Sequence, residues 1–189
     1  MGIVKIDAWG IRAKGLQPRE LGAHDNYGVN VYPPCSGMAL IALDGLPDKE
    51  VPLMDRKHMA GNHVLLRCSA ADVLLGHLKP GSVGVDKGDP VAAGDRVARV
   101  GNAGNTAEPH LHIQAQRQGT LGEPFSGNPL PMRLDGRCPV RNDRLTAYCE
   151  FPAAKQARCD AYMQMPLQSP QRIRSYFRGP RLIRIKNLP

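Results

Sequence analysis

Residues 62–78 read NHVLLRCSAADVLLGHL, which is two apolar segments separated by Ser69-Ala70. Both segments are rich in valine and leucine, and a two-residue link is the commonest connection in a β-hairpin. The stretch therefore predicts two buried antiparallel strands. The same reasoning predicts further strands at residues 2–7, 29–32, 38–43 and 110–116.

Composition favours one β domain with an appendage. The chain has 189 residues, among them 20 glycines and 17 prolines, and aromatic residues make up only 5%. This composition is typical of short strands joined by tight turns, not of a helical bundle. We expect a mainly β domain over residues 1–145. Residues 146–189 are expected to form an irregular, basic tail, peripheral or flexible, with a short helix near residues 153–163.

The net charge of +8 indicates an acidic partner without identifying it. Cell wall, nucleic acids and membranes are all anionic. Aromatic residues beside a basic stripe would be needed for base stacking and are lacking, so we expect no nucleic-acid partner. No apolar run is long enough to span a bilayer, and Met1–Lys5 leads into a strand instead of a signal peptide. If the protein acts outside the membrane, we expect its export signal to be missing from this chain.

The five cysteines include no CxxC pair, which argues against a structural zinc knuckle. Cys35 and Cys68 each lie at the end of a predicted strand. They form a disulfide if the domain is exported, or they are two small buried thiols. The sequence leaves both interpretations open.

The histidines suggest a site of chemistry. In His110-Leu111-His112 the two imidazoles lie on one face of a strand, because side chains alternate, and two imidazoles on one face can share a metal or divide ligand and proton-carrying roles. A Gly- and Asn-rich segment, residues 101–109, precedes them, and His77 near another strand end can reach the same face. The other histidines, His24, His58 and His63, are expected to be solvated polar residues.

These features occur in an order that resembles the lysostaphin-type (LytM-like) zinc endopeptidases. The likeness covers roughly residues 28–118 and extends more weakly from residue 1 to about residue 145. The segments that carry it are Gly76-His77-Leu78, Pro80-Gly81-Ser82-Val83, Gly88-Asp89, Gly94-Asp95, Val100–Thr106 and Pro109–His112.

The resemblance implies a curved antiparallel sheet of the lysostaphin-type peptidase or barrel-sandwich hybrid kind. It implies that His112 is a zinc ligand and that His77 and His110 are catalytic residues beside the metal-bound water. Asn102, Asn105 and Thr106 are expected to line the substrate groove by position. The implied substrates are peptides of peptidoglycan or similar peptides, and the implied location is the cell envelope, periplasm or extracellular space.

One departure from the family pattern concerns the metal ligands. The family takes a further His and Asp from a motif on the first strand, and here Gly2 stands where the Asp is expected. The missing His would lie before Met1, as if the domain were truncated at its N-terminus. His24-Asp25 and the segment Asn26–Asn30 offer only polar substitutes, and amides are poor zinc ligands. We therefore expect zinc to bind weakly, or not at all, unless these ligands are replaced.

Three alternatives to an active peptidase follow. A catalytically inactive peptidoglycan-binding or regulatory domain of the same family is favoured by Gly2. A biotinyl or lipoyl carrier fits the Gly-Asp turns but needs a lysine at a hairpin tip, commonly flanked by methionine, and Lys87 has no methionine beside it. A nucleic-acid binder is permitted by charge and disfavoured by the scarcity of aromatic residues.

Overall fold

The computed structural model describes residues 1–134, 138–147 and 181–186. Within them the regular secondary structure is almost entirely β, with a single turn of 3-10 helix at Leu21–Ala23. The strands are β1 (Gly2–Ile6), β2 (Asn30–Val31), β3 (Gly37–Leu43), β4 (Asn62–Cys68), β5 (Asp72–Leu78), β6 (Pro90–Val91), β7 (Ala98–Arg99), β8 (Leu111–Gln116), β9 (Pro129–Leu130), β10 (Arg144–Ala147) and β11 (Arg181–Lys186). The strands expected from the sequence are confirmed.

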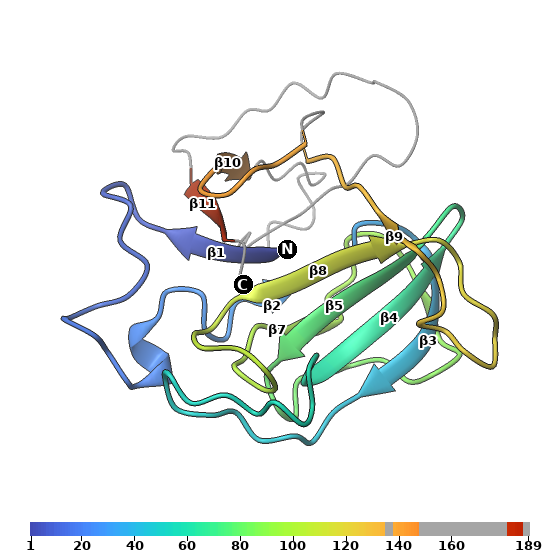
Figure 1. Ribbon diagram of the computed structural model, residues 1–189, viewed down its shortest axis with the longest axis horizontal. Helices are drawn as coiled ribbons and strands as arrows, with labels where there is room; N and C mark the ends of the chain where they lie inside the picture. Colours follow the sequence, from blue (N-terminus) through green and yellow to red (C-terminus); the bar gives the residue numbers. More distant parts are fainter. Residues whose placement is uncertain (135–137, 148–180, 187–189) are drawn as a thin grey trace, which may run out of the picture.

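Among the described residues, nine strands form one sheet in the order β10-β11-β1-β8-β5-β4-β3-β6, and β9 also pairs with β8. The strands β2 and β7 form a separate pair. All strand pairs are antiparallel. In Figure 1, β1, β10 and β11 lie on one side of β8, and β5, β4 and β3 lie on the other. The expected mainly β, antiparallel fold class is therefore confirmed.

The β4–β5 hairpin brings apolar side chains to one face of the sheet. Cys68 N–H donates to Ala71 O across the two-residue link (2.8 Å). The side chains that alternate onto this face are fully or almost fully buried in the main core, which also takes in residues of the β2–β7 pair. They are Val64, Leu66, Val73, Leu75, Ile113 and Ala115, with Val31 and Ala98 from the smaller sheet.

The opposite face of the same strands carries a smaller apolar cluster and most of the polar side chains. Leu65 and Leu74 pair across β4 and β5, and both are buried together with Leu40. We call this face, which also carries His112, the polar face. Because successive side chains point to opposite faces, each residue of β4 and β8 is assigned to the main core or to the polar face by its position alone.

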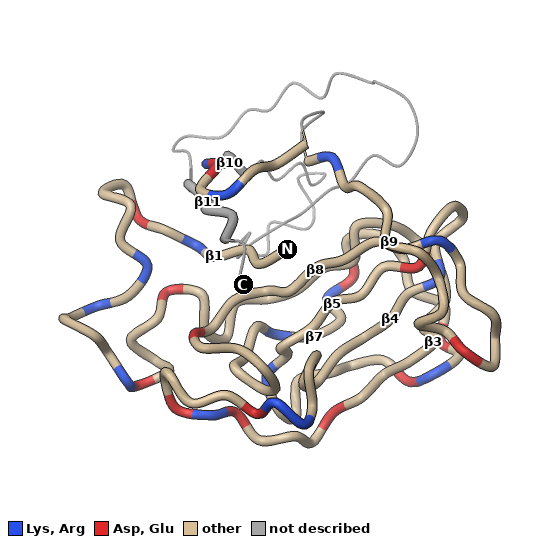
Figure 2. Tube along the Cα trace, viewed as in Figure 1, with Lys and Arg blue, Asp and Glu red and all other residues tan. Residues whose placement is uncertain are grey.

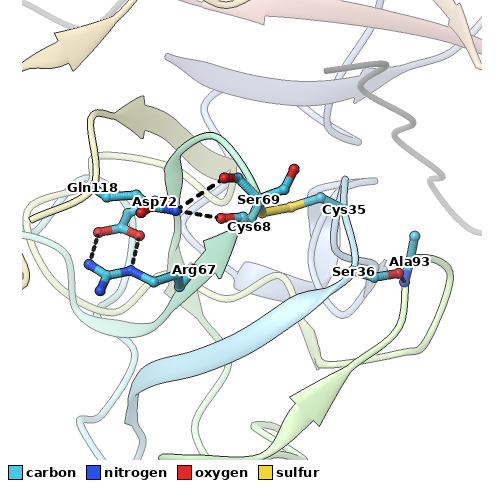
Figure 3. The surroundings of a disulfide bond; sticks show 8 residues. All are labelled: Cys35, Ser36, Arg67, Cys68, Ser69, Asp72, Ala93 and Gln118. Carbon is cyan, nitrogen blue, oxygen red and sulfur yellow. Dashed lines mark hydrogen bonds and ion pairs between the residues drawn. A yellow bond between two sulfur atoms is a disulfide. The ribbon is translucent and has the colours of Figure 1, made fainter. Parts of the chain in front are cut away.

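The structure contains a disulfide between Cys35 and Cys68, which decides between the two interpretations of these cysteines. It joins the segment before β3 to the end of β4 (Figure 3). Near it, Arg67 makes two hydrogen bonds to the carboxylate of Asp72, both of 2.9 Å, and the Asp72 side chain is fully buried. These contacts fasten the β4–β5 hairpin at its turn.

Two segments near the predicted domain boundary and in the predicted tail are strands. β11 pairs with β1 from Gly2↔Lys186 to Ile6↔Leu182, and β10 pairs with β11. The sequence interpretation contained neither strand. The helix expected near residues 153–163 lies outside the described residues, and the boundary between domain and tail stays a prediction.

Charged residues lie mainly in the connections and at strand ends, and the middles of β4, β5 and β8 carry none (Figure 2). Both signs are interspersed along the connection between β1 and β2 (Figure 2). The described residues include no helix with the length and apolar character that a membrane span requires.

Candidate active site

Three histidines lie together at one end of the sheet. His77 is in β5, His112 is in β8, and His110 lies just before β8. One ligand nitrogen of each lies within 4.8 Å of the other two. The ring centroid of His77 lies 4.8 Å from that of His110 and 5.6 Å from that of His112. We call these residues the histidine cluster, and within the described residues no other group of three or more His, Cys, Asp or Glu is placed to share a metal ion.

The pairing of β5 with β8 explains how His112 faces the cluster. Its neighbours Leu111 and Ile113 belong to the main core, so His112 points to the polar face. Gly76 is its cross-strand partner. A Cβ atom at Gly76 would lie 3.1 Å from Ala60 O and 3.5 Å from His112 Cβ. Glycine at this position therefore allows the backbone of Ala60 to approach closely.

His77 reaches the cluster because its backbone departs from a regular strand. Gly76 already faces the polar side, so regular alternation would send His77 toward the main core. The φ angle of His77 is +59°, in the left-handed region that few residues other than glycine adopt. Its N–H donates to Ala60 O (2.9 Å), and its carbonyl accepts from Gly101 N–H (2.8 Å). These bonds hold a conformation that costs about 1–3 kcal/mol.

Backbone carbonyls orient two of the rings. His77 Nδ1 lies 2.8 Å from Ala103 O, and His110 Nδ1 lies 2.9 Å from Glu108 O. A carbonyl only accepts, so both Nδ1 atoms carry the proton and both Nε2 atoms carry the lone pair. Thr106 Oγ1 lies 3.0 Å from His110 Nδ1 and donates to the same Glu108 carbonyl (2.7 Å). Metal-binding histidines commonly have such a carbonyl partner, which fixes the tautomer and the direction of the ligand nitrogen.

Burial keeps the imidazoles of His77 and His112 neutral at neutral pH. Removal from water lowers the pKa of His77 to about 4 and the pKa of His112 to about 4. Desolvation penalises the imidazolium ion far more than the neutral ring. Because a histidine must be unprotonated to bind a metal, the site is ready for a metal ion over the whole neutral range.

The glycine-rich loop packs closely around the cluster. Gly104 has a φ angle of +90°, and a Cβ atom there would collide with the backbone of Gly61 and His58. Asp55 N–H donates to Gly104 O (2.9 Å), and Asn105 N–H donates to Met59 O (3.2 Å). The loop therefore forms one body with residues 55–61.

The three residues expected to line the groove lie at different depths. Asn102 and Thr106 are fully buried, and Asn102 is bonded to Asp48 and Lys49 (2.6 and 2.7 Å). The Asn102 side chain holds the loop against residue 49, and the Thr106 hydroxyl contacts the His110 ring. Asn105 is partly exposed and stays a candidate for substrate contact.

The register between β1 and β8 defines where the Asp expected at residue 2 would lie. Gly2 of β1 pairs with His112 of β8, so a side chain at residue 2 would lie beside His112 on the same face. Of the polar substitutes, Asn26 donates to Ile3 O (3.2 Å), and His24 is buried with Nε2 3.3 Å from Pro18 O. Three imidazoles are a chemically suitable set for Zn²⁺. The residues present thus fit a metal ion through nitrogen ligands. Among the described residues, no carboxylate belongs to this group.

The expectations for the other histidines have different outcomes. His58 is partly exposed and pairs with Asp55 (2.9 Å). His24 is buried, so the expectation that it is solvated is wrong: the loop before β2 folds over it. His63 is partly buried, and its ring lies against Phe125. His63 was expected to be solvated and is so only in part; its position in the strand, one residue before the core residue Val64, assigns it to the polar face.

A family model, Peptidase family M23, matches residues 27–124, which is more than half of the chain and includes all three residues of the histidine cluster. The chain belongs to peptidase family M23. This confirms the family resemblance drawn from the sequence.

Several solved structures are similar to this M23 domain. LytU is 24% identical over 50% of this chain and 57% of its own, with a TM-score of 0.39, so the match spans little more than half of LytU. A mutant catalytic domain of the prophage-encoded M23 protein EnpA from Enterococcus faecalis is 21% identical over 68% and 87% of the two chains, with a TM-score of 0.41. The catalytic domain of the antimicrobial peptidase lysostaphin from Staphylococcus simulans is 22% identical over 64% and 80%, with a TM-score of 0.40.

Proposed function

We propose that this M23 domain is a zinc-dependent endopeptidase that cleaves peptides of peptidoglycan or similar peptides. The observation that carries the proposal is the histidine cluster, with three ligand nitrogens within 4.8 Å of one another on the polar face of the sheet. Family membership supports it, because the cluster lies inside the matched residues.

In this proposal His112 is a metal ligand. A bound zinc ion supplies Lewis-acid chemistry, by polarising the scissile carbonyl and lowering the pKa of water. His77 and His110 carry Nε2 lone pairs in the same cluster, and a ring whose Nε2 is not bound to the metal is suited to take a proton from a nucleophilic water and return it to the leaving amine. Their Nδ1 bonds to backbone carbonyls stabilise the imidazolium form that such a transfer creates.

The proposed location is the cell envelope, periplasm or extracellular space. The Cys35–Cys68 disulfide supports it, because disulfides persist mainly in oxidising compartments. The net charge of +8 favours association with an anionic wall polymer.

The test measures zinc and peptide cleavage together. Purified protein is titrated with zinc and then incubated with peptidoglycan, and newly released amino groups are counted. We expect zinc-dependent release from the wild type, and none from His112→Ala. A wild type that releases no amines at saturating zinc would overturn the catalytic proposal.

A second candidate is a peptidoglycan-binding domain without activity. The specific observation in its favour is Gly2, which pairs with His112 and offers no side chain to the metal. Binding of peptidoglycan without cleavage would identify it. In that case Gly2→Asp, which adds a carboxylate on the face of His112, is expected to raise zinc affinity at least about tenfold.

A further inference from the structure

His63 lies on the same face of the sheet as the histidine cluster. The next residue, Val64, is in the main core, whereas Leu65 pairs with Leu74 on the polar face. Side chains two residues apart share a face, so His63 and Leu65 do, and so do Leu74 and Gly76, the partner of His112. This alternation places His63 on the polar face at the β4 end next to residue 60.

The backbone around His63 connects it directly to the cluster. Ala60 O, three residues before it, accepts the N–H of His77 (2.9 Å). The pKa of His77 is lowered mainly by burial and, to a smaller extent, by a positive charge on His63. His63 is not among the three histidines placed to share a metal.

A hydrogen bond to the backbone fixes which ring nitrogen of His63 is the acceptor. Its Nδ1 lies 2.8 Å from Gly61 O, so Nδ1 carries the proton and Nε2 carries the lone pair. Burial lowers the pKa of His63 from its ordinary value, which keeps the ring neutral at neutral pH. The lone pair on Nε2 can accept a hydrogen bond, and the donors that a peptide backbone offers are its N–H groups.

The ring of Phe125 lies beside the ring of His63. It comes from the connection between β8 and β9, and its ring centroid lies 5.8 Å from that of His63 at an interplanar angle of 58°. The Phe125 side chain is 50% exposed, so half of its surface is open to a ligand. An imidazole on the polar face and a half-exposed aromatic ring thus lie side by side.

The connection that carries Phe125 is fastened to the sheet at several points. Asp72 accepts the N–H of Gly119 (2.9 Å), and Gln116 Nε2 donates to Pro124 O (2.6 Å). Gln118 donates to Cys68 O (2.8 Å) beside the disulfide (Figure 3). A ring on a connection held in this way is pre-organised for binding.

We propose that His63 and Phe125 form a peptide-binding subsite next to the histidine cluster, in which His63 Nε2 accepts a backbone N–H of the substrate and the Phe125 ring packs against the adjoining peptide segment. The inference rests on the proposed function, because it takes peptidoglycan peptides as the ligand. It assigns these two residues to substrate binding and not to metal binding or proton transfer.

The test measures binding of soluble peptidoglycan fragments to the metal-free full chain, where no cleavage takes place. His63→Phe keeps a ring beside Phe125 and removes the acceptor, and we expect the Kd to rise about tenfold. Phe125→Ala is expected to raise the Kd about fivefold to tenfold. His63→Gln, which restores an acceptor oxygen, is expected to recover part of the affinity. Leu121→Ala is the matched control, because Leu121 lies in the same connection and is 76% exposed.

Zinc content and kinetics separate this role from the others. With zinc, His63→Phe is expected to bind as much metal as the wild type and to raise KM while kcat stays within about twofold. Wild-type affinity in His63→Phe, or loss of zinc from it, would overturn the subsite and leave the proposed peptidase standing. A wild type that neither binds nor cleaves peptidoglycan would overturn both.

Discussion

The two faces of β4, β5 and β8 are built from alternate residues of the same strands and differ in almost every property. One face is apolar and buried in the main core, as Leu66, Leu75 and Ile113 illustrate. The other carries histidines, amides and an ion pair, with only a small apolar cluster around Leu65 and Leu74. One side of each strand therefore stabilises the fold, and the other is available for chemistry, so substitutions on the two sides should be separable.

The largest expected effect is on activity, from His77→Asn on the polar face. Asn tolerates a positive φ, so the free energy of unfolding should change by less than about 1 kcal/mol. Loss of the imidazole should lower kcat by about 10²–10⁴-fold. Urea unfolding and amine release measure the two quantities. A stable variant with full activity would show that His77 is no part of the catalytic site.

On the main-core face, Leu75→Ala should lower stability and leave the metal site unchanged. Leu75 is fully buried, and removing its side chain should lower the free energy of unfolding by about 2–5 kcal/mol. Zinc affinity of the folded fraction should stay near that of the wild type. His112→Ala, on the other face of the adjacent strand, is the matched control and should remove zinc binding with little loss of stability.

Arg67→Met tests an exception to this comparison, a residue of the polar face that stabilises the fold. Arg67 lies on the polar face, yet its partner Asp72 is fully buried, so removing the guanidinium leaves a buried carboxylate without its counter-charge. We expect a loss of about 2–3 kcal/mol in urea unfolding. The double variant Arg67→Met/Asp72→Leu should regain most of it. An unchanged stability of the single variant would mean that water replaces the guanidinium.

The last prediction concerns the dependence of stability on pH. The pKa values of His77 and His112 are about 4 in the folded chain and near 6.5 in an unfolded one. Between these values the unfolded chain binds more protons, so stability is complete above about pH 6.5 and falls as pH decreases toward about 4. The melting temperature of metal-free protein should show this fall. In His77→Asn/His112→Asn the slope should be shallower, and an identical slope would contradict the assignment.

Alternation along the chain explains why much of the fold was predictable. Apolar runs in residues 62–78 predicted the hairpin, and the spacing of His110 and His112 predicted that their rings meet on one side. These are properties of neighbouring residues and follow from strand geometry alone. The Cys35–Cys68 bond, by contrast, depends on where two distant strand ends meet, so the sequence left it undecided.

Three features depended on long-range packing and were not predictable from the spacing of residues. His77 was expected to reach the cluster from its strand end, but the left-handed backbone conformation by which it does so, held by Ala60 and Gly101, was not foreseen. His24 is buried by a connection whose path is not encoded in local periodicity. The pairing of β11 with β1 joins residues about 180 positions apart in the chain, for which a single sequence provides no signal.

β11 also bears on solubility. β1 shares two residue pairs with β8 and five with β11, so its far edge is covered by the C-terminal strand. Without β11 the strand GIVKI would present unsatisfied backbone groups at an open sheet margin, the kind of surface that recruits other chains into fibrils or aggregates. Shortened versions of this protein that end before residue 181 should therefore self-associate through the edge of β1 that faces away from β8.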